Sequence, residues 1–258
     1  MKRAKKETTF RGDILRLLSG TTLSQLIGIL SIPIITRYFL PEAFGVSAMF
    51  LSIISILGVV STLRYELAIV IPKSDVDGAN LLTLSIISTT LNTTLCSILI
   101  AFLGENILSV LNLDSLLPYI WLIPIGILID GLFKSFNYWN TRTKSFTRLS
   151  IAKVLQKLSG NILSILLGIL GYLGGIILII SGLIGKIIAT SSLAINILKE
   201  DKKWFKKEIK FHRIKRLAKR YSKFPKFMIW SSLLNSISWQ IPVLMFGSFF
   251  STTIVGFY

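Results

Sequence analysis

Seven long apolar segments separated by short polar connections dominate this 258-residue chain. The hydrocarbon core of a bilayer is about 30 Å thick and takes roughly 20 residues of helix to cross, which these segments provide. Backbone polar groups in lipid must be bonded within their own segment, so helices are favoured over isolated strands. We predict an all-α, polytopic membrane helix bundle. The segments are Ile14–Thr36, Phe44–Leu63, Ala79–Leu103, Leu116–Phe136, Ile151–Leu170, Gly174–Leu198 and Phe227–Phe250.

The basic residues fall on alternate connections between these segments. Of the 29 Lys and Arg residues, six precede residue 17, two lie in Arg64–Lys73, six in Lys134–Lys157 and thirteen in Lys199–Lys226. Only Arg37 and Lys186 lie elsewhere. Loops rich in Lys and Arg stay in the cytoplasm, so we expect a multi-pass inner (plasma) membrane protein with a cytoplasmic N-terminus. This topology accounts for the net charge of +17 without a nucleic-acid partner.

A faint internal repeat appears when Gly45 is aligned with Gly256. Tyr38 and Phe39 then correspond to Phe249 and Phe250, and Pro33 falls within two positions of Pro242. Six crossings return the chain to its starting side, so a second copy would run parallel to the first, as in transporters with two similar halves. We expect a six-helix lobe over 1–198, a basic cytoplasmic connection over 199–226, and the first helix of a second lobe over 227–258.

The basic connection has apolar residues at helical spacing from Trp204 to Phe224. This pattern predicts an amphipathic helix on the inner leaflet, held by apolar burial and by attraction to anionic membrane lipids. Its simplest role is a surface linker between the lobes. Recruitment of an anionic lipid-linked substrate is the alternative.

Four stretches of the sequence resemble one family. They are RYFLPEAFG (Arg37–Gly45), LRYELAIVIPKSD (Leu63–Asp75), LLNSISWQIPVL (Leu233–Leu244) and VGFY (Val255–Tyr258). They are similar to the corresponding stretches of bacterial polysaccharide flippases, the O-antigen and capsule translocases related to multidrug and toxic compound exporters. The resemblance implies two six-helix bundles that move a lipid diphosphate-linked oligosaccharide across the inner membrane for lipopolysaccharide or capsule synthesis. Most of the second bundle is missing here, so the chain looks C-terminally truncated by comparison.

The resemblance also implies partners: the lipid-linked oligosaccharide, membrane lipids and the polysaccharide polymerase machinery. Two alternatives stay open, a small-molecule cation antiporter of the same architecture and a nontransporting scaffold or fragment. We expect no enzymatic activity, no cofactor and no metal, because the sequence contains no HExxH, P-loop, GxSxG or paired-carboxylate pattern in a polar stretch.

Three charged residues are candidates for lining a substrate cavity. Lys186 lies in the middle of an apolar segment, where an ionisable side chain is costly and normally faces the bundle interior or water. It is expected to attract the anionic substrate, or else to extend to the headgroups or to pair with Asp130. Asp130 has three possible roles: a partner for Lys186, a site for a coupling ion, or a residue at headgroup level. Arg37 forms an ion pair with Glu42 or assists substrate release.

Four further residues are predicted to shape the helices. Gln25 is expected to bond between helices rather than to bind a ligand. Pro33, Pro124 and Pro242 lie within predicted spans, where each would remove a backbone hydrogen bond and bend its helix. Glycines concentrated in the fifth and sixth segments are expected to allow close helix packing.

Overall fold

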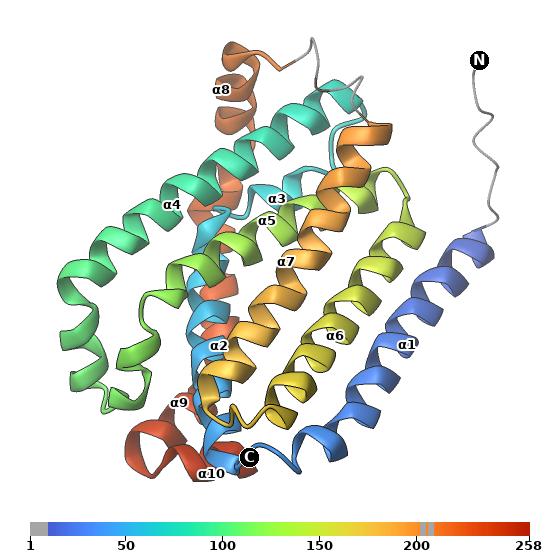
Figure 1. The fold of residues 1–258 in the computed structure, drawn as a ribbon. Helices are drawn as coiled ribbons and strands as arrows, with labels where there is room; N and C mark the ends of the chain where they lie inside the picture. Colours follow the sequence, from blue (N-terminus) through green and yellow to red (C-terminus); the bar gives the residue numbers. More distant parts are fainter. Residues whose placement is uncertain (1–9, 202–204, 206–208) are drawn as a thin grey trace.

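The computed structural model describes residues 10–201, 205 and 209–258, with side chains from residue 18 onward. These residues form helices and no strand, which confirms the all-α prediction. The long helices run side by side along one body, and successive helices run in opposite directions (Figure 1). Two short helices, α8 (Phe211–Arg220) and α10 (Thr252–Phe257), cap this body at opposite ends. We call these the α8 end and the α10 end.

The long helices match the seven predicted segments. They are α1 (Phe10–Ile35), α2 (Pro41–Ser61), α4 (Asp75–Val110), α5 (Leu122–Arg142), α6 (Phe146–Ile169), α7 (Gly175–Glu200) and α9 (Ile229–Phe249). Shorter helices are α3 (Tyr65–Ala68), α8 (Phe211–Arg220) and α10 (Thr252–Phe257), with a 3-10 turn at Asp114–Tyr119 and a π-helical turn at Phe224–Met228.

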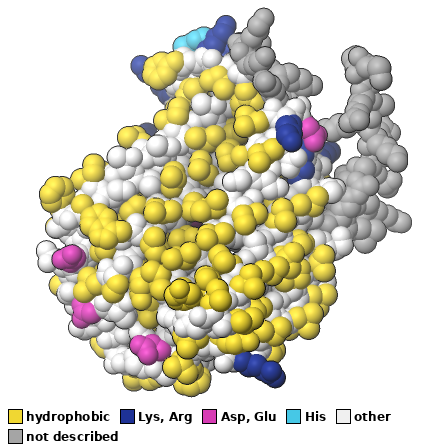
Figure 2. All heavy atoms as spheres, viewed as in Figure 1, with side chains coloured by type: hydrophobic (Ala, Val, Ile, Leu, Met, Phe, Trp, Pro, Cys, Tyr) yellow, Lys and Arg dark blue, Asp and Glu magenta, His cyan; other side chains and the backbone are white. Residues whose placement is uncertain are grey.

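Four of these helices are long and apolar enough to cross a bilayer, namely α1 (over Leu18–Ile35), α2, α4 and α7. Crossing by α5, α6 and α9 stays a prediction. Hydrophobic side chains spread over the middle of the face shown in Figure 2, and most of the Lys and Arg side chains in view lie toward the α8 end. Leu30, Phe102 and Val110 are each more than 70 % exposed, as expected of lipid-facing side chains. The chain is a membrane protein.

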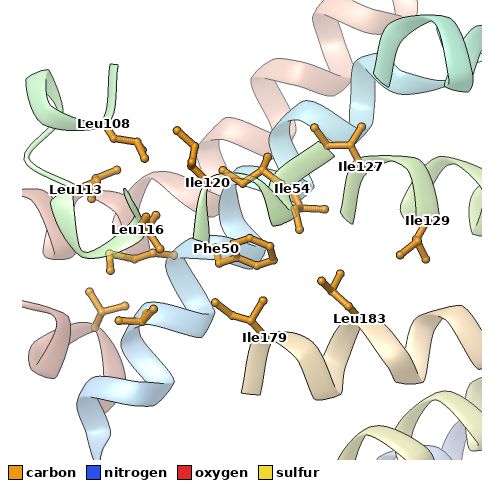
Figure 3. Close-up of a cluster of buried hydrophobic side chains, with 14 residues drawn as sticks. Phe50, Ile54, Leu108, Leu113, Leu116, Ile120, Ile127, Ile129, Ile179 and Leu183 are labelled. Atoms are coloured by element: carbon orange, nitrogen blue, oxygen red, sulfur yellow. The ribbon is translucent and has the colours of Figure 1, made fainter. Parts of the chain in front are cut away.

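The main hydrophobic core lies between α2, α5, α7 and the turn that follows α4. Phe50 and Ile54 of α2 pack against Ile179 and Leu183 of α7, and Leu116 fills the space beside them (Figure 3). These side chains are nearly or fully buried. This packing holds α2, α5 and α7 against one another, which positions the charged residues farther along α5 and α7.

A second hydrophobic cluster closes the α8 end. Ile214, Leu217 and Tyr221 of the α8 region are buried with Trp139 of α5 and Leu81 of α4. The apolar stripe predicted to enter the inner leaflet therefore packs on the protein itself, because the N-terminal half of α4 offers it a complementary apolar surface. The helix is also shorter than predicted, and positions 204 and 206–208 of that prediction lie outside the described residues.

Glycines allow the expected close packing at several crossings. A Cβ atom on Gly185 would lie 2.5 Å from the Gln156 carbonyl oxygen, so α7 and α6 touch through their backbones there. Gly160 is the facing residue on α6. Other glycines in the same run do not pack: Gly182 has no atom within 4 Å of a built Cβ, and Gly171 adopts a positive φ of 86° in the turn after α6.

The two aligned glycines, Gly45 and Gly256, meet at the α10 end. A Cβ on Gly45 of α2 would lie only 1.8 Å from the Thr252 oxygen, and a Cβ on Gly256 of α10 would lie 1.8 Å from the Pro41 oxygen. Pro41 stands four residues before Gly45, and Thr252 stands four residues before Gly256. Each copy thus makes the same contact with the other, which is the signature of a twofold relation. The contact is reciprocal at these two positions, and the predicted repeat and its lobe boundaries stay predictions.

Candidate functional site

Three charged side chains meet between α5 and α7. Lys186 Nζ donates to Asp130 Oδ1 at 2.5 Å, and Lys134 Nζ lies 2.5 Å from Asp130 Oδ2. Lys134 follows Asp130 by one helical turn, which places both on one face of α5, whereas α7 presents Lys186 from the opposite side. Of the alternatives for Lys186, pairing with Asp130 is the one that the structure shows.

The neighbouring helix α2 completes this cluster with its backbone. Lys134 Nζ also donates to the Gly58 carbonyl oxygen at 3.1 Å. A Cβ on Gly58 would lie 2.5 Å from Asp130 Oδ2, so the carboxylate fits only because position 58 has no side chain. Phe133 lies below the Lys186 ammonium, with 5.9 Å between Nζ and the ring centroid, a favourable cation–π distance.

The three-residue cluster carries a net positive charge. One carboxylate faces two ammonium groups, and the Asp130 side chain is only 11 % exposed while the two lysine side chains are 24 % and 28 % exposed. The carboxylate holds both amines in place, and their remaining donors stay partly accessible. Such an arrangement attracts an anion with several oxygen acceptors, whereas a cation would meet a carboxylate that is already engaged.

Sequence reasoning missed Lys134 as a member of this cluster. The charge pattern assigns Lys134 to a basic cytoplasmic connection, Lys134–Lys157, although the predicted apolar segment extends to Phe136 and already contains this residue. The helix in fact continues to Arg142. The i,i+4 spacing from Asp130 was the available signal.

Arg37 does not join the other two predicted cavity residues. It is exposed in the turn between α1 and α2 at the α10 end. Gly58, which touches Asp130, stands seventeen residues along α2 from Pro41, so roughly 25 Å of helix separates the two positions. Among the described residues, no ion pair links Arg37 to Glu42, and both side chains are exposed.

The residues predicted to shape helices behave differently from one another. Pro33 and Pro242 lie inside α1 and α9, as predicted. Pro124 instead occupies the first turn of α5, where backbone N–H groups have no partner within the helix, so it removes no intrahelical bond. Gln25 is exposed on α1. The helix-to-helix bond predicted for it is not among those described. Gln240 makes such a bond instead, accepting from Ser52 of α2 at 2.8 Å.

Arginines at the α8 end form a further polar network, although each was counted only as a topological charge. Arg142 donates to the carbonyl oxygens of Ile69 and Pro72, at 2.9 and 2.6 Å, and pairs with Asp75 at 3.1 Å. It thereby clamps the connection between α3 and α4. Arg148 pairs with Asp201 at 3.2 Å, which ties α6 to the end of α7.

Arg64 and Glu66 form another ion pair at this end, 3.1 Å apart. Glu66 is almost completely buried, and both Leu63 and Arg64 adopt left-handed backbone angles, with φ values of 51° and 60°. Non-glycine residues take these angles only where surrounding contacts hold them. The LRYE stretch therefore forms a strained turn between α2 and α3 with its charges turned inward.

Comparison with known proteins identifies the family but no individual relative. A family model described as polysaccharide biosynthesis protein matches residues 34–258. No curated protein and no solved structure matches the chain. The matched region includes α2 to α10, the charged cluster and the reciprocal glycine contact. The chain therefore belongs to the polysaccharide biosynthesis protein family.

Proposed function

We propose that this protein translocates lipid-linked oligosaccharide repeat units across the inner membrane for the synthesis of a surface polysaccharide such as O-antigen. In this proposal the α8 end, with the N-terminus, faces the cytoplasm. The observation that carries the proposal is the net-positive cluster of Lys134, Asp130 and Lys186 near the middle of α5 and α7. Family membership supplies the link to polysaccharides.

The chemistry of the cluster favours an anionic cargo. Placing an ionisable group at the centre of a bilayer costs roughly 2.5 to 3.5 kcal/mol on insertion scales. Two lysines at this depth therefore indicate that their charge has a function. The diphosphate of a lipid-linked sugar carries negative charge and several acceptor oxygens, which suit two ammonium groups. A cation antiporter would instead need an acidic residue free to bind its ion, and Asp130 is engaged by both lysines.

The proposal is tested with the purified full chain and a lipid diphosphate-linked oligosaccharide. Lys186→Gln and Lys134→Gln are each expected to weaken binding roughly tenfold, because each removes one charge-assisted contact. Lys157→Gln, an exposed residue of α6 outside the cluster, is the matched control and should bind normally. In proteoliposomes the same two cluster variants should lose translocation, and mass spectrometry should recover the substrate chemically unchanged.

Normal binding and translocation by Lys186→Gln at equal protein abundance would refute this role for the cluster. Cleavage or extension of the oligosaccharide during the assay would instead indicate an enzyme. Transport of small cations across the membrane in the absence of the oligosaccharide would favour the antiporter.

A further inference from the structure

A polar cavity of about 330 Å³ lies where α8 rests on the N-terminal end of α4. Two residues of α4 and its preceding turn form one wall, and one face of α8 forms the other. The lining residues are Ser74, Asp77, Arg213, Arg216, Leu217 and Arg220. This cavity is distant from the lysine cluster, which lies between α5 and α7 farther along the bundle.

The sequence of α8 places its basic side chains on two different faces. Ile214, Leu217 and Tyr221 turn toward the protein core and fix the rotation of the helix. With that face buried, Arg213, Arg216 and Arg220 follow one another at three- and four-residue spacing along the cavity wall. Lys215 and Lys219 are exposed and do not line the cavity.

The cavity carries a positive charge that its own residues do not cancel. Asp77 is the acidic residue in its lining, against three arginines. The nearby Asp75 is engaged by Arg142. In the described part of the chain, Arg216 and Arg220 form no ion pair, although Arg220 stacks on Tyr221 at 5.7 Å.

The end of α4 adds to this field. A 36-residue helix begins at Asp75, and its first backbone N–H groups have no partner within the helix. The Ser74 side chain, at the N-cap position, makes no capping hydrogen bond and lines the cavity instead. Helix N-termini favour anions because of these unpaired N–H groups and because of the helix dipole. Here the N-terminus of α4 lies beside the three arginines of the cavity.

Arginines line the cavity, whereas lysines lie on the outer face of α8, and this division indicates what kind of ligand the cavity binds. The planar guanidinium group binds phosphate through two parallel hydrogen bonds, whereas lysine acts as a point charge. Phe211 at the start of α8 and Phe227 just after it are 81 % and 68 % exposed, so apolar rings flank the basic helix. Exposed aromatic rings beside a basic surface are typical of the headgroup region of a membrane.

We propose that this cavity binds the phosphate group of an anionic membrane lipid and thereby holds α8 and the start of α4 at the leaflet surface. Basic pockets at the cytoplasmic side of membrane helices bind lipid headgroups in this way. The site does not depend on the translocation proposed above, because its residues and its ligand are separate from the lysine cluster.

The test measures lipid binding by the purified full chain in mixed micelles of neutral detergent. Phosphatidylglycerol is titrated against phosphatidylcholine, and inorganic phosphate forms a third arm. The wild type is expected to prefer phosphatidylglycerol at least tenfold over both. The Arg216→Gln/Arg220→Gln pair should lose roughly tenfold in affinity or more, since two charge-assisted contacts are removed.

The matched control is Lys215→Gln/Lys219→Gln, which removes the same charge from the outer face of the same helix. It should change affinity by less than about threefold, because general attraction between an exposed charge and the micelle surface is screened at physiological salt. Asp77→Asn should raise affinity, because it removes the acidic lining residue. Thermal melting shows whether each variant is folded.

Equal losses in the two double variants would overturn the proposal, since they would indicate attraction to net charge alone. Binding of inorganic phosphate as tight as that of the lipid would also overturn it, by showing a site for free phosphate. A decrease in affinity for Asp77→Asn would contradict the electrostatic argument directly.

Discussion

At the scale of single residues, the Asp130 carboxylate is the centre of the charged cluster. It compensates two lysines that would otherwise repel each other in a low-dielectric environment, and Gly58 leaves room for it. Removing a buried charge while its partners remain is more costly than removing the whole group, because the partners stay desolvated. The cluster therefore behaves as a unit, and its members are tested together.

Asp130→Asn is expected to lower the free energy of unfolding by about 2 to 3 kcal/mol, less than the roughly 3 to 5 kcal/mol of fully buried pairs because both lysines are partly exposed. Adding Lys134→Gln should restore part of the loss, since it removes one of the two uncompensated cations. Denaturation of both variants in detergent measures the difference. A double variant no more stable than Asp130→Asn would show that repulsion between the lysines is unimportant.

The sequence predicted Lys186 and Asp130 from their position in apolar segments, but it predicted Lys134 only as a loop charge. The difference is physical: hydropathy marks a charge surrounded by apolar residues, whereas Lys134 lies where the helix leaves its apolar stretch. Arg64, Arg142 and Arg148 were missed for the same reason. Counting charges predicts which side of the membrane a connection faces. It does not predict the ion-pair partner of a basic residue, because helix packing decides which helix ends come together.

At the scale of helices, most elements follow from hydrophobic length. The predicted Ile14–Thr36 and Gly174–Leu198 segments became α1 and α7 with ends within a few residues. Helix α4 extends beyond its predicted segment at both ends. At its start, Asp75 and Asp77 suit a helix N-terminus although they lower its hydropathy. The contact of α8 with α4 was not predictable, since an amphipathic pattern does not state whether lipid or protein covers the apolar stripe.

Arg142 holds the connection between α3 and α4 in place, and its fork is suited to two carbonyls and one carboxylate. Arg142→Lys is expected to lower the free energy of unfolding by about 2 kcal/mol, since a single ammonium cannot reach all three acceptors. Hydrogen exchange should increase over residues 69–78. The same measurement on Lys157→Arg, at an exposed position, is the control. Unchanged exchange in Arg142→Lys would show that the connection is held by other contacts.

At the scale of the whole molecule, the alternating direction of the long helices brings the basic connections of the described chain to one end. Arg142 and Arg148 and all of α8 lie at the α8 end, whereas the connection after α6 at the other end contains Tyr172 and no charge. The arrangement in space therefore agrees with the topology inferred from charge, in which the α8 end is cytoplasmic.

Single cysteines introduced after Cys96→Ser test this orientation in intact cells. Tyr172→Cys, in the exposed turn between α6 and α7, is expected to react with a membrane-impermeant maleimide added outside. Lys73→Cys, in the exposed connection before α4, should react only after the membrane is permeabilised. The opposite pattern would reverse the predicted orientation, and labelling of both from outside would show that the helices between them do not cross as expected.

The reciprocal contact of Gly45 and Gly256 also has a consequence for the order of folding. Helix α2 is synthesised and inserted early, whereas Thr252–Phe257 follow about two hundred residues later. Contacts between positions so distant in the chain form slowly, after local ones. The surface of α2 at Gly45 therefore stays without its α10 partner while the intervening helices are made. Translation itself thus makes this junction close only after the helices between α2 and α10 have been made.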